Sequence, residues 1–394
     1  MLLFAVAIAR CLKEESAPMP RLAFPSHLAA LLPALLLLGC GEAAPQTEPP
    51  LPPEALEAVS DDPGADREKL ARAVDALFSR EDLGETRAVI VMHAGETAAE
   101  RYVEGYGPQT RFVGWSMSKT VTAVLIGMLV ADGRLRLDDS PPIPRWQRAG
   151  DPRGEITLRQ LLQMRSGLRH EEKAEPVYAS GEVRMMFLDG RDDMAAWAEA
   201  QPLEHEPGRV FQYSTPDSIV LSDVATRVVA PRGNAAARQQ AMAEFMHARL
   251  AVPLKMDSLT GEYDAAGTLT GGSMIWATAR DWARFGEFLR HKGSVGGAQI
   301  VPRGWIEFMT RPSPRAPDYG AMTWLNRPSG EDRDVLFSDQ GPASLFAAVG
   351  HLGQYVLVSP EQRLVIVRLG KTDEEDRAAL VDALAEIVEL YPQA

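Results

Sequence analysis

A serine and a lysine three residues apart form the first pair in this sequence that could do chemistry. Ser116 and Lys119 open a long apolar run that ends at Ala131, and such a run predicts a helix. Positions i and i+3 share one face of a helix, so the lysine amine can reach the serine hydroxyl. A serine nucleophile needs such a group to take its proton, and burial would lower the pKa of Lys119 toward that of a useful base. The start of a helix also offers free N–H groups to a developing oxyanion.

A tyrosine is the second candidate. Tyr213 follows Pro207-Gly208 and Phe211, and it lies just before a helical run that begins at Ser218. A tyrosine near positive charge can act as a phenolate or as a proton relay. Tyr213-Ser214-Thr215 therefore predicts a second group for proton transfer.

The third candidate is the segment 351–354, which reads His-Leu-Gly-Gln and enters a predicted strand. Gly353 would let a substrate approach the backbone closely. The N–H group of the next residue, Gln354, could then donate to an oxyanion.

Each motif has a structural alternative when it stands alone. S-x-x-K occurs by chance in a chain of this length, and a capped helix with an exposed lysine is then the alternative. The tyrosine can simply pack at a loop–helix junction, and the glycine can form a turn before an edge strand. The three motifs together are more specific, because each falls at the helix, loop or strand position that its chemistry needs.

In this order the motifs resemble those of the serine β-lactamase and penicillin-binding superfamily, in its class C branch. That branch includes class C β-lactamases, D-amino-acid peptidases, family VIII carboxylesterases and 6-aminohexanoate-dimer hydrolases. The resemblance covers about residues 67–394, and the flanking segments 112–115, 156–168, 271–274 and 281–286 are also similar.

The resemblance implies that Ser116 attacks a carbonyl and forms an acyl-enzyme, which water then releases. It implies that Lys119 and Tyr213 share the proton transfer, and that the backbone N–H groups of Ser116 and Gln354 hold the oxyanion. It implies no cofactor and no metal. Further candidates for substrate binding are His351, Gly353, Thr215 and Trp115, with a position in the core as the alternative for Trp115.

Two departures from the lactamase pattern bear on the substrate. Thr215 stands where lactamases usually carry Asn, and His351-Leu352-Gly353 stands where they usually carry Lys-Thr-Gly. Without that lysine, which helps to bind a substrate carboxylate, efficient turnover of β-lactams is not expected. We therefore expect a hydrolase of esters or amides, with a D-amino-acid peptidase or weak β-lactamase as the alternative. The loops between Glu171 and Asp192 would decide the substrate.

Other classes of protein fit less well. An α/β-hydrolase needs G-x-S-x-G after a strand, and the segment 114–118 lacks the last glycine. A metallohydrolase is disfavoured because the chain has no H-E-x-x-H motif. A non-catalytic sensor that binds cell-wall or other peptides remains the alternative from another class, although an intact Ser, Lys and Tyr argue against it.

The predicted helices and strands that carry these residues suggest an α+β fold of the α/β-sandwich type. Strand-like runs lie near both ends, at 87–93, 98–103, 345–349, 354–359 and 364–369, while 157–249 and 275–290 are mostly helical. The simplest arrangement is one antiparallel sheet flanked by helices, including terminal helices near 66–78 and 374–390, with a helical lobe of about 135–290 inserted. Asp66 is expected to cap the first of these helices.

The N-terminus predicts export. The apolar run from Leu28 to Gly39 has the length of the apolar core (h-region) of a signal peptide and ends in Leu-Leu-Gly-Cys, which resembles a bacterial lipobox. We expect removal of residues 1–39, lipidation of Cys40, and a flexible tether over 40–65 before a domain over 66–394. The true start is expected at Met19, because only there does charge precede the apolar run. A plain secretory signal or a buried helix is the alternative.

Composition limits the partners. The 394 residues include 54 acidic and 41 basic side chains, and the net charge of −13 with no basic run argues against nucleic acid. We expect a small ester, amide or short peptide as substrate. Contact with the membrane is expected only through the lipid, on the periplasmic side of the bacterial envelope. The sequence does not predict an oligomeric state.

Overall fold

The main sheet of the computed structural model has six antiparallel strands, in the order β2-β1-β11-β10-β9-β8. The structure describes residues 50–331 and 333–393; residues 1–39, Cys40 and the first part of the expected tether lie outside them. The six strands are β1 (Glu85–His93), β2 (Glu96–Tyr102), β8 (Trp324–Leu325), β9 (Phe346–Gly350), β10 (Gln354–Ser359) and β11 (Leu364–Lys371). The first and last parts of the described chain thus share one sheet, as the sequence predicted.

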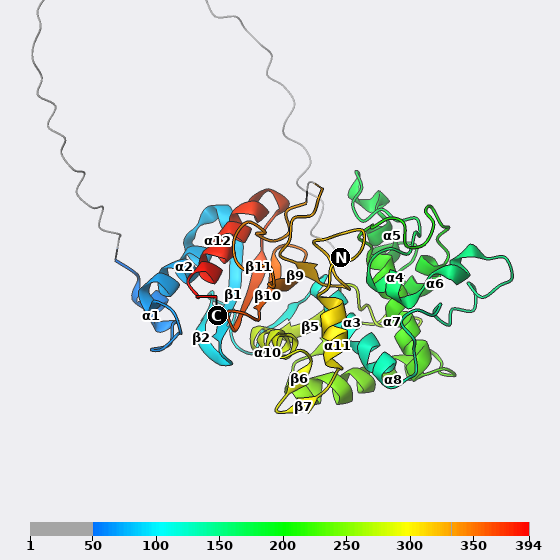
Figure 1. Cartoon of the computed structure of the whole chain (residues 1–394), viewed down its shortest axis with the longest axis horizontal. Helices are drawn as coiled ribbons and strands as arrows, with labels where there is room; N and C mark the ends of the chain where they lie inside the picture. Colours follow the sequence, from blue (N-terminus) through cyan, green and yellow to red (C-terminus); the bar gives the residue numbers. More distant parts are fainter. Residues whose placement is uncertain (1–49, 332, 394) are drawn as a thin grey trace, which may run out of the picture. The chain divides into compact units, whose positions relative to one another are not determined.

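Helices cover both faces of this sheet (Figure 1). On one side α2 (Arg67–Ser79) and α12 (Arg377–Glu389) pack together, and on the other side α10 (Ala279–Arg290) packs on β1, β10 and β11. Because β11 is covered on both faces, it reads Leu-Val-Ile-Val-Arg-Leu-Gly and is buried up to Lys371. A Cβ on Gly286 of α10 would lie only 2.5 Å from Val365, so this glycine allows the close approach of helix and sheet.

The helical lobe lies beside the sheet (Figure 1). It is joined to the sheet by α3 (Met117–Ala131), which packs on β9 and β10 and also on α7 (Thr215–Val229). Its other helices are α4 (Leu158–Leu162), α5 (Gly181–Phe187), α6 (Met194–Glu199), α8 (Ala235–Met246) and α9 (Val252–Leu254), and α11 (Arg303–Met309) follows later in the chain. The α+β class with an inserted helical lobe is therefore confirmed.

A smaller sheet links the two lobes. It has the order β3-β5-β4, from β3 (Arg111–Val113), β5 (Ile275–Thr278) and β4 (Thr260–Gly261), while β6 (Ser294–Val295) and β7 (Ala298–Gln299) form a separate hairpin. The prediction of one helix over 275–290 was wrong at its start, because Ile275 to Thr278 pair with β3. Thr278 ends this strand and caps α10 by accepting a hydrogen bond from the Asp281 N–H group.

The prediction that the folded domain begins at Asp66 was also wrong. Asp66 does cap α2, since its side chain accepts from the Lys69 N–H group at 2.9 Å. However, a short helix, α1 (Pro53–Glu57), already packs on α2 within the predicted tether. Ala55 and Val59 are buried there, because the few apolar side chains of this stretch find a surface on the domain.

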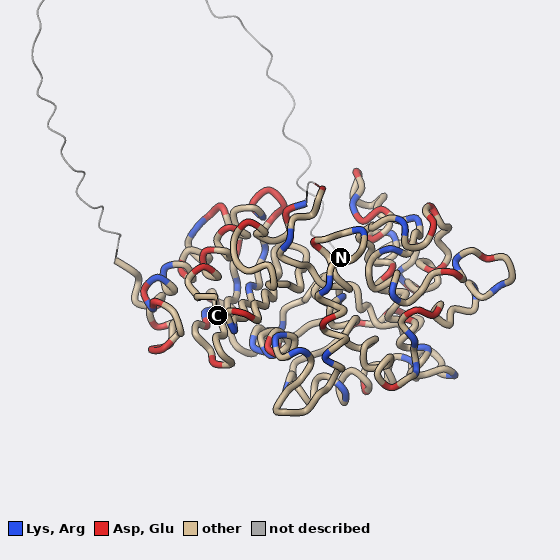
Figure 2. The backbone as a smooth tube through the Cα atoms, viewed as in Figure 1, with Lys and Arg blue, Asp and Glu red and all other residues tan. Residues whose placement is uncertain are grey.

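Acidic and basic residues are interspersed along the described chain, as Figure 2 shows. Many of these charges form local pairs, such as Arg249 with Asp132 and Arg280 with Glu100. Within residues 50–393, no helix has both the length and the apolar character that crossing a membrane requires.

Candidate active site

The first turn of α3 places Ser116 at the edge between sheet and helical lobe. The residue before it, Trp115, has φ +46°, a left-handed conformation that is uncommon for a side chain of this size. This sharp entry places Ser116 in the cap position of α3, yet its side chain makes no capping hydrogen bond. The Ser116 hydroxyl is therefore free to interact with another group.

That other group is Lys119. Its Nζ donates to Ser116 Oγ at 2.9 Å, to Thr215 Oγ1 at 2.9 Å and to the Gly272 carbonyl oxygen at 3.0 Å. An ammonium has three N–H donors, so all three are used. The structure thus brings together Ser116 and Lys119, as predicted, and adds Gly272 to them.

Two adjacent glycines allow this approach. A Cβ on Gly272 would lie 2.4 Å from Ser218 Oγ, and one on Gly271 would lie 2.3 Å from Ser222 Oγ. Larger residues would push the loop away from α7, and the Gly272 carbonyl would then leave Lys119. These glycines begin the segment 271–274, which resembles the corresponding segment of the family but had no predicted role.

Tyr213 and Thr215 reach the site from the start of α7. Ser214 caps this helix by accepting from the Asp217 N–H group, and Thr215 is its first residue. Lys119 Nζ lies 5.0 Å from the centroid of the Tyr213 ring, which also stacks on Trp324 of β8 at 5.4 Å. The predicted trio of Ser116, Lys119 and Tyr213 is therefore together in space.

Exposure differs within this group. Ser116 and Tyr213 are partly exposed, whereas Lys119 and Thr215 are 1% and 0% exposed. Part of Ser116 and part of Tyr213 therefore face solution, while Lys119 is shielded.

The pKa of Lys119 differs from the expectation. Burial alone would lower it, as the sequence predicted, but Tyr213, Glu172 and Glu182 face the ammonium and outweigh the burial, so the pKa is raised. Burial also raises the pKa of Tyr213, against the opposing influence of Lys119. The resting site therefore holds a charged lysine and a neutral tyrosine at pH 7.

Two carboxyl groups beneath the lysine were missed at the sequence level. Glu172 accepts hydrogen bonds from both the hydroxyl and the N–H group of Thr215, and Glu182 lies 3.5 Å from the same hydroxyl. Burial and the charge of Glu172 raise the pKa of Glu182 to about 7. Both residues fall in the segment 171–192 that was expected to decide the substrate, with Glu182 in the first turn of α5, but no motif marks them.

The His351 segment forms the hairpin between β9 and β10. The His351 ring packs edge-on against Trp115 at 5.5 Å, and partial burial lowers its pKa, so the ring is neutral at pH 7. Trp115 is only partly buried, which removes the alternative of a core position. Trp115 directly precedes Ser116 in the chain, so the His351 ring packs on the residue next to the candidate nucleophile.

Gly353 and Gln354 have a clear structural role in the same hairpin. A Cβ on Gly353 would lie 2.7 Å from Arg368 Nη1, so the close neighbour that requires glycine here is the buried Arg368. The Gln354 side chain donates to the carbonyl groups of His351 at 3.0 Å and Gly370 at 2.7 Å. Gln354 itself begins β10, between β9 and β11, and its role as an oxyanion donor stays a prediction.

Comparison with known families agrees with this geometry. The family model described as Beta-lactamase matches residues 81–389, which include Ser116, Lys119, Tyr213 and the hairpin. The chain belongs to the Beta-lactamase family.

The chain is similar to a hydrolase, a carboxylesterase and a penicillin-binding protein homologue. The 6-aminohexanoate-dimer hydrolase of Paenarthrobacter ureafaciens is 25% identical over 339 residues, which cover 80% of this chain and 81% of the relative. A family VIII carboxylesterase superposes with a TM-score of 0.60 at 17% identity, over 84% of this chain and 98% of its own. A penicillin-binding protein homologue from Caulobacter crescentus gives 0.58 at 18% identity, over 83% and 98%. The solved structures confirm the fold.

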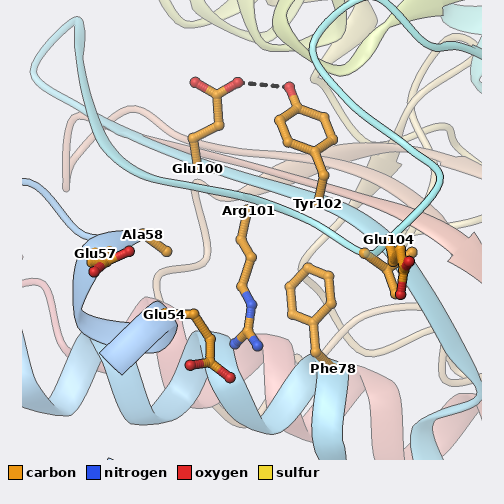
Figure 3. A pocket seen from close by; sticks show the side chains of 9 residues that line it. Glu54, Glu57, Ala58, Phe78, Glu100, Arg101, Tyr102 and Glu104 are labelled. Atoms are coloured by element: carbon orange, nitrogen blue, oxygen red, sulfur yellow. Dashed lines mark hydrogen bonds between the residues drawn. The ribbon is translucent and has the colours of Figure 1, made fainter. Parts of the chain in front are cut away.

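A separate pocket in this Beta-lactamase family member lies at the opposite edge of the main sheet (Figure 3). It has a volume of about 520 Å³ and is lined by residues of α1, α2 and β2, the edge strand farthest from β8. In it, Arg101 pairs with Asp75 at 2.6 Å and lies over the Phe78 ring at 4.6 Å. Because Trp324 of β8 stacks on Tyr213, the candidate catalytic residues belong to the other edge.

Proposed function

We propose that this chain is a serine hydrolase that cleaves an ester or amide bond through an acyl-enzyme on Ser116. The observation that supports this most strongly is the hydrogen bond of 2.9 Å between Lys119 Nζ and Ser116 Oγ at the start of α3. Nucleophilic catalysis requires an accessible hydroxyl with a proton-transfer group beside it, and Ser116 meets both conditions. The names of the relatives favour hydrolysis of amides or esters.

In the proposed reaction, Lys119 first gives up one proton to solvent and acts as the neutral amine. Ser116 Oγ then bonds to the substrate carbonyl carbon, its proton passes to Lys119, and a proton passes from Lys119 through Tyr213 to the leaving alcohol or amine. The bond to the leaving group breaks, and the acyl group stays on Ser116. Water then attacks the acyl-enzyme, gives a proton to the same pair and releases the acid. The N–H groups of Met117, Ser118 and Lys119 already donate to backbone carbonyl groups, so the proposed oxyanion donor at the start of α3 is the Ser116 N–H group.

The residues around the site favour neutral substrates over β-lactams. His351 is neutral at pH 7, so it offers a β-lactam carboxylate only a neutral hydrogen bond, and Glu172 adds negative charge near Lys119. A charge-assisted hydrogen bond is roughly twice as strong as a neutral one, so an anionic substrate loses more than a neutral ester does.

The test is turnover of a short-chain nitrophenyl ester by the purified domain, together with labelling by a fluorophosphonate. A serine hydrolase gives both turnover and a labelled protein. A protein that binds acyl peptides without turning over any ester, and that resists the probe, would instead be a sensor of the penicillin-binding type.

We also propose that the domain is exported and held at the bacterial envelope by lipid on Cys40. The support is the sequence Leu37-Leu38-Gly39-Cys40 at the end of an apolar run that has the length of a signal-peptide h-region. Cys40→Ser is expected to move the protein from the membrane fraction to the soluble periplasmic fraction. A native protein already wholly in the soluble fraction would contradict the anchor.

A further inference from the structure

Both carboxylate oxygens of Glu172 are directed at the start of α7. Oε2 accepts from the Thr215 N–H group at 2.8 Å and contacts His170 Nε2, and Oε1 accepts from the Thr215 hydroxyl. The Glu172 side chain is 19% exposed and His170 only 1%. Glu172 is thus fixed by three contacts, two of them with the same threonine.

The Thr215 hydroxyl connects this carboxylate to the lysine. A hydroxyl has one proton to donate, and Thr215 gives it to Glu172 while it accepts from Lys119 Nζ at 2.9 Å. An unbroken chain of hydrogen bonds therefore leads from Ser116 Oγ through Lys119 and Thr215 to Glu172. If Thr215 had no carboxylate next to it, there would be less negative charge near the Lys119 ammonium.

Several charged or ionisable groups surround this series of hydrogen bonds. Those that act most strongly on Lys119 are Tyr213, Glu172 and Glu182, and those that act on Glu172 include His170 and Lys119. The negative charge of Glu172 also contributes to raising the pKa of two buried groups, Asp217 in α7 and Tyr319 in the loop before β8. Burial raises the pKa of Asp217 to about 7 and that of Glu182 to about 7, so Glu172 is the carboxyl that stays ionised throughout the neutral range.

We propose that Glu172 is a positioning residue of the active site, which holds the Lys119 ammonium against Ser116 through the Thr215 hydroxyl and supplies its balancing charge. This inference rests on the proposed function, because it assigns Glu172 to the same proton transfer. It also gives Thr215 a role: with Glu172 behind it, a threonine can fix the lysine at the position where lactamases use an asparagine.

The first experiment measures kcat/KM for a nitrophenyl ester against pH. If Lys119 must lose its proton before Ser116 reacts, the acidic limb of the profile reports the Lys119 pKa. Glu172→Gln removes a nearby negative charge, so this limb should move to lower pH by about one pH unit or more. The plateau should also fall, because an amide cannot accept both bonds from Thr215.

Glu171→Gln is the matched control. It removes the same charge from the neighbouring residue, whose side chain is exposed, and it should leave both the limb and the plateau unchanged. Thr215→Val interrupts the hydrogen-bond chain but keeps both charges, so it should lower the plateau roughly tenfold or more with a smaller movement of the limb. If Glu172→Gln fails to fold, Thr215→Val carries the kinetic test, and a wild-type rate in that variant would overturn the proposal.

The second experiment does not depend on activity. Protein with ¹³C-labelled lysine is titrated by NMR, and the Lys119 signal is assigned by its absence in Lys119→Arg. The proposal predicts a lower Lys119 pKa in Glu172→Gln than in wild type or Glu171→Gln. Equal values in all three proteins would overturn it, even if the enzyme hydrolyses esters. A shifted value in a protein without ester turnover would keep the role of Glu172 and reject the proposed function.

Discussion

The Gly272 carbonyl oxygen lies 3.0 Å from Lys119 Nζ and accepts one of its three hydrogen bonds, although 153 residues separate them in the chain. The loop before β5 therefore forms one wall of the lysine site. Its position depends on the absence of a side chain at Gly272, where a Cβ would lie 2.4 Å from Ser218 Oγ and 3.1 Å from Thr215.

Gly272→Ala should therefore reduce activity without touching a catalytic group. We expect kcat/KM for a nitrophenyl ester to fall about 10- to 100-fold, because a small displacement of Lys119 misaligns it with Ser116. Overpacking should also lower the free energy of unfolding by about 1–3 kcal/mol. Gly304→Ala in α11 is the control, since a Cβ there meets no atom within 4 Å, and it should leave both quantities near wild type. Equal activity of the two variants would speak against the role of the Gly272 carbonyl.

Asp217 predicts a specific dependence of stability on pH. The side chain is 1% exposed and accepts from Ser166 Oγ at 2.8 Å, while its second oxygen has no partner in the described chain. Burial raises its pKa to about 7, so the folded state binds a proton that the unfolded state has released. The stability that this group contributes is complete below the unfolded pKa of about 4 and is lost as the pH rises through about 7.

Asp217→Asn removes this titration. Relative to wild type, the free energy of unfolding of the variant should therefore rise by about 2–3 kcal/mol between pH 5 and pH 8. Denaturant titrations at the two pH values measure it, with Asp382→Asn on the exposed face of α12 for comparison. A difference from wild type that is the same at both pH values would show that Asp217 is ionised in the folded protein at pH 5.

Substrate selectivity follows from the neutral His351. The ratio of kcat/KM for nitrocefin to that for nitrophenyl butyrate should lie well below one at pH 7. A differential loss of about 1–3 kcal/mol corresponds to a selectivity that is roughly 5- to 150-fold lower for the anionic substrate. His351→Lys restores a cation and should raise the ratio. A wild-type ratio well above one would contradict the proposed substrate class.

The sequence predicted those parts of the fold that local patterns specify. The alternating and β-rich runs gave β1, β2, β9, β10 and β11, and the run after Ser116 gave α3. The strand β5 was missed because its four residues lead directly into α10, with no breaker between them. Its partner β3, three residues long, is equally hard to recognise from a pattern.

For the same reason, only the contacts between residues close together in the sequence could be predicted for the site. Ser116 and Lys119 are three residues apart on one helix, so their contact follows from helix geometry. Glu172 and Thr215 are 43 residues apart, and only the packing of the helical lobe brings them together. The charge of Lys119 was mispredicted for this reason, since burial was visible in the sequence pattern while the carboxyl groups beneath it were not.

Mass spectrometry after labelling identifies the residue that carries the acyl group, which we propose to be Ser116. The purified domain is treated with a fluorophosphonate, digested, and its peptides are sequenced, in parallel with folded Ser116→Ala protein. We expect one adduct on Ser116 in the wild type, no adduct in the variant, and a loss of ester turnover by several orders of magnitude in the variant. An adduct on another residue, or near wild-type turnover by Ser116→Ala, would contradict it.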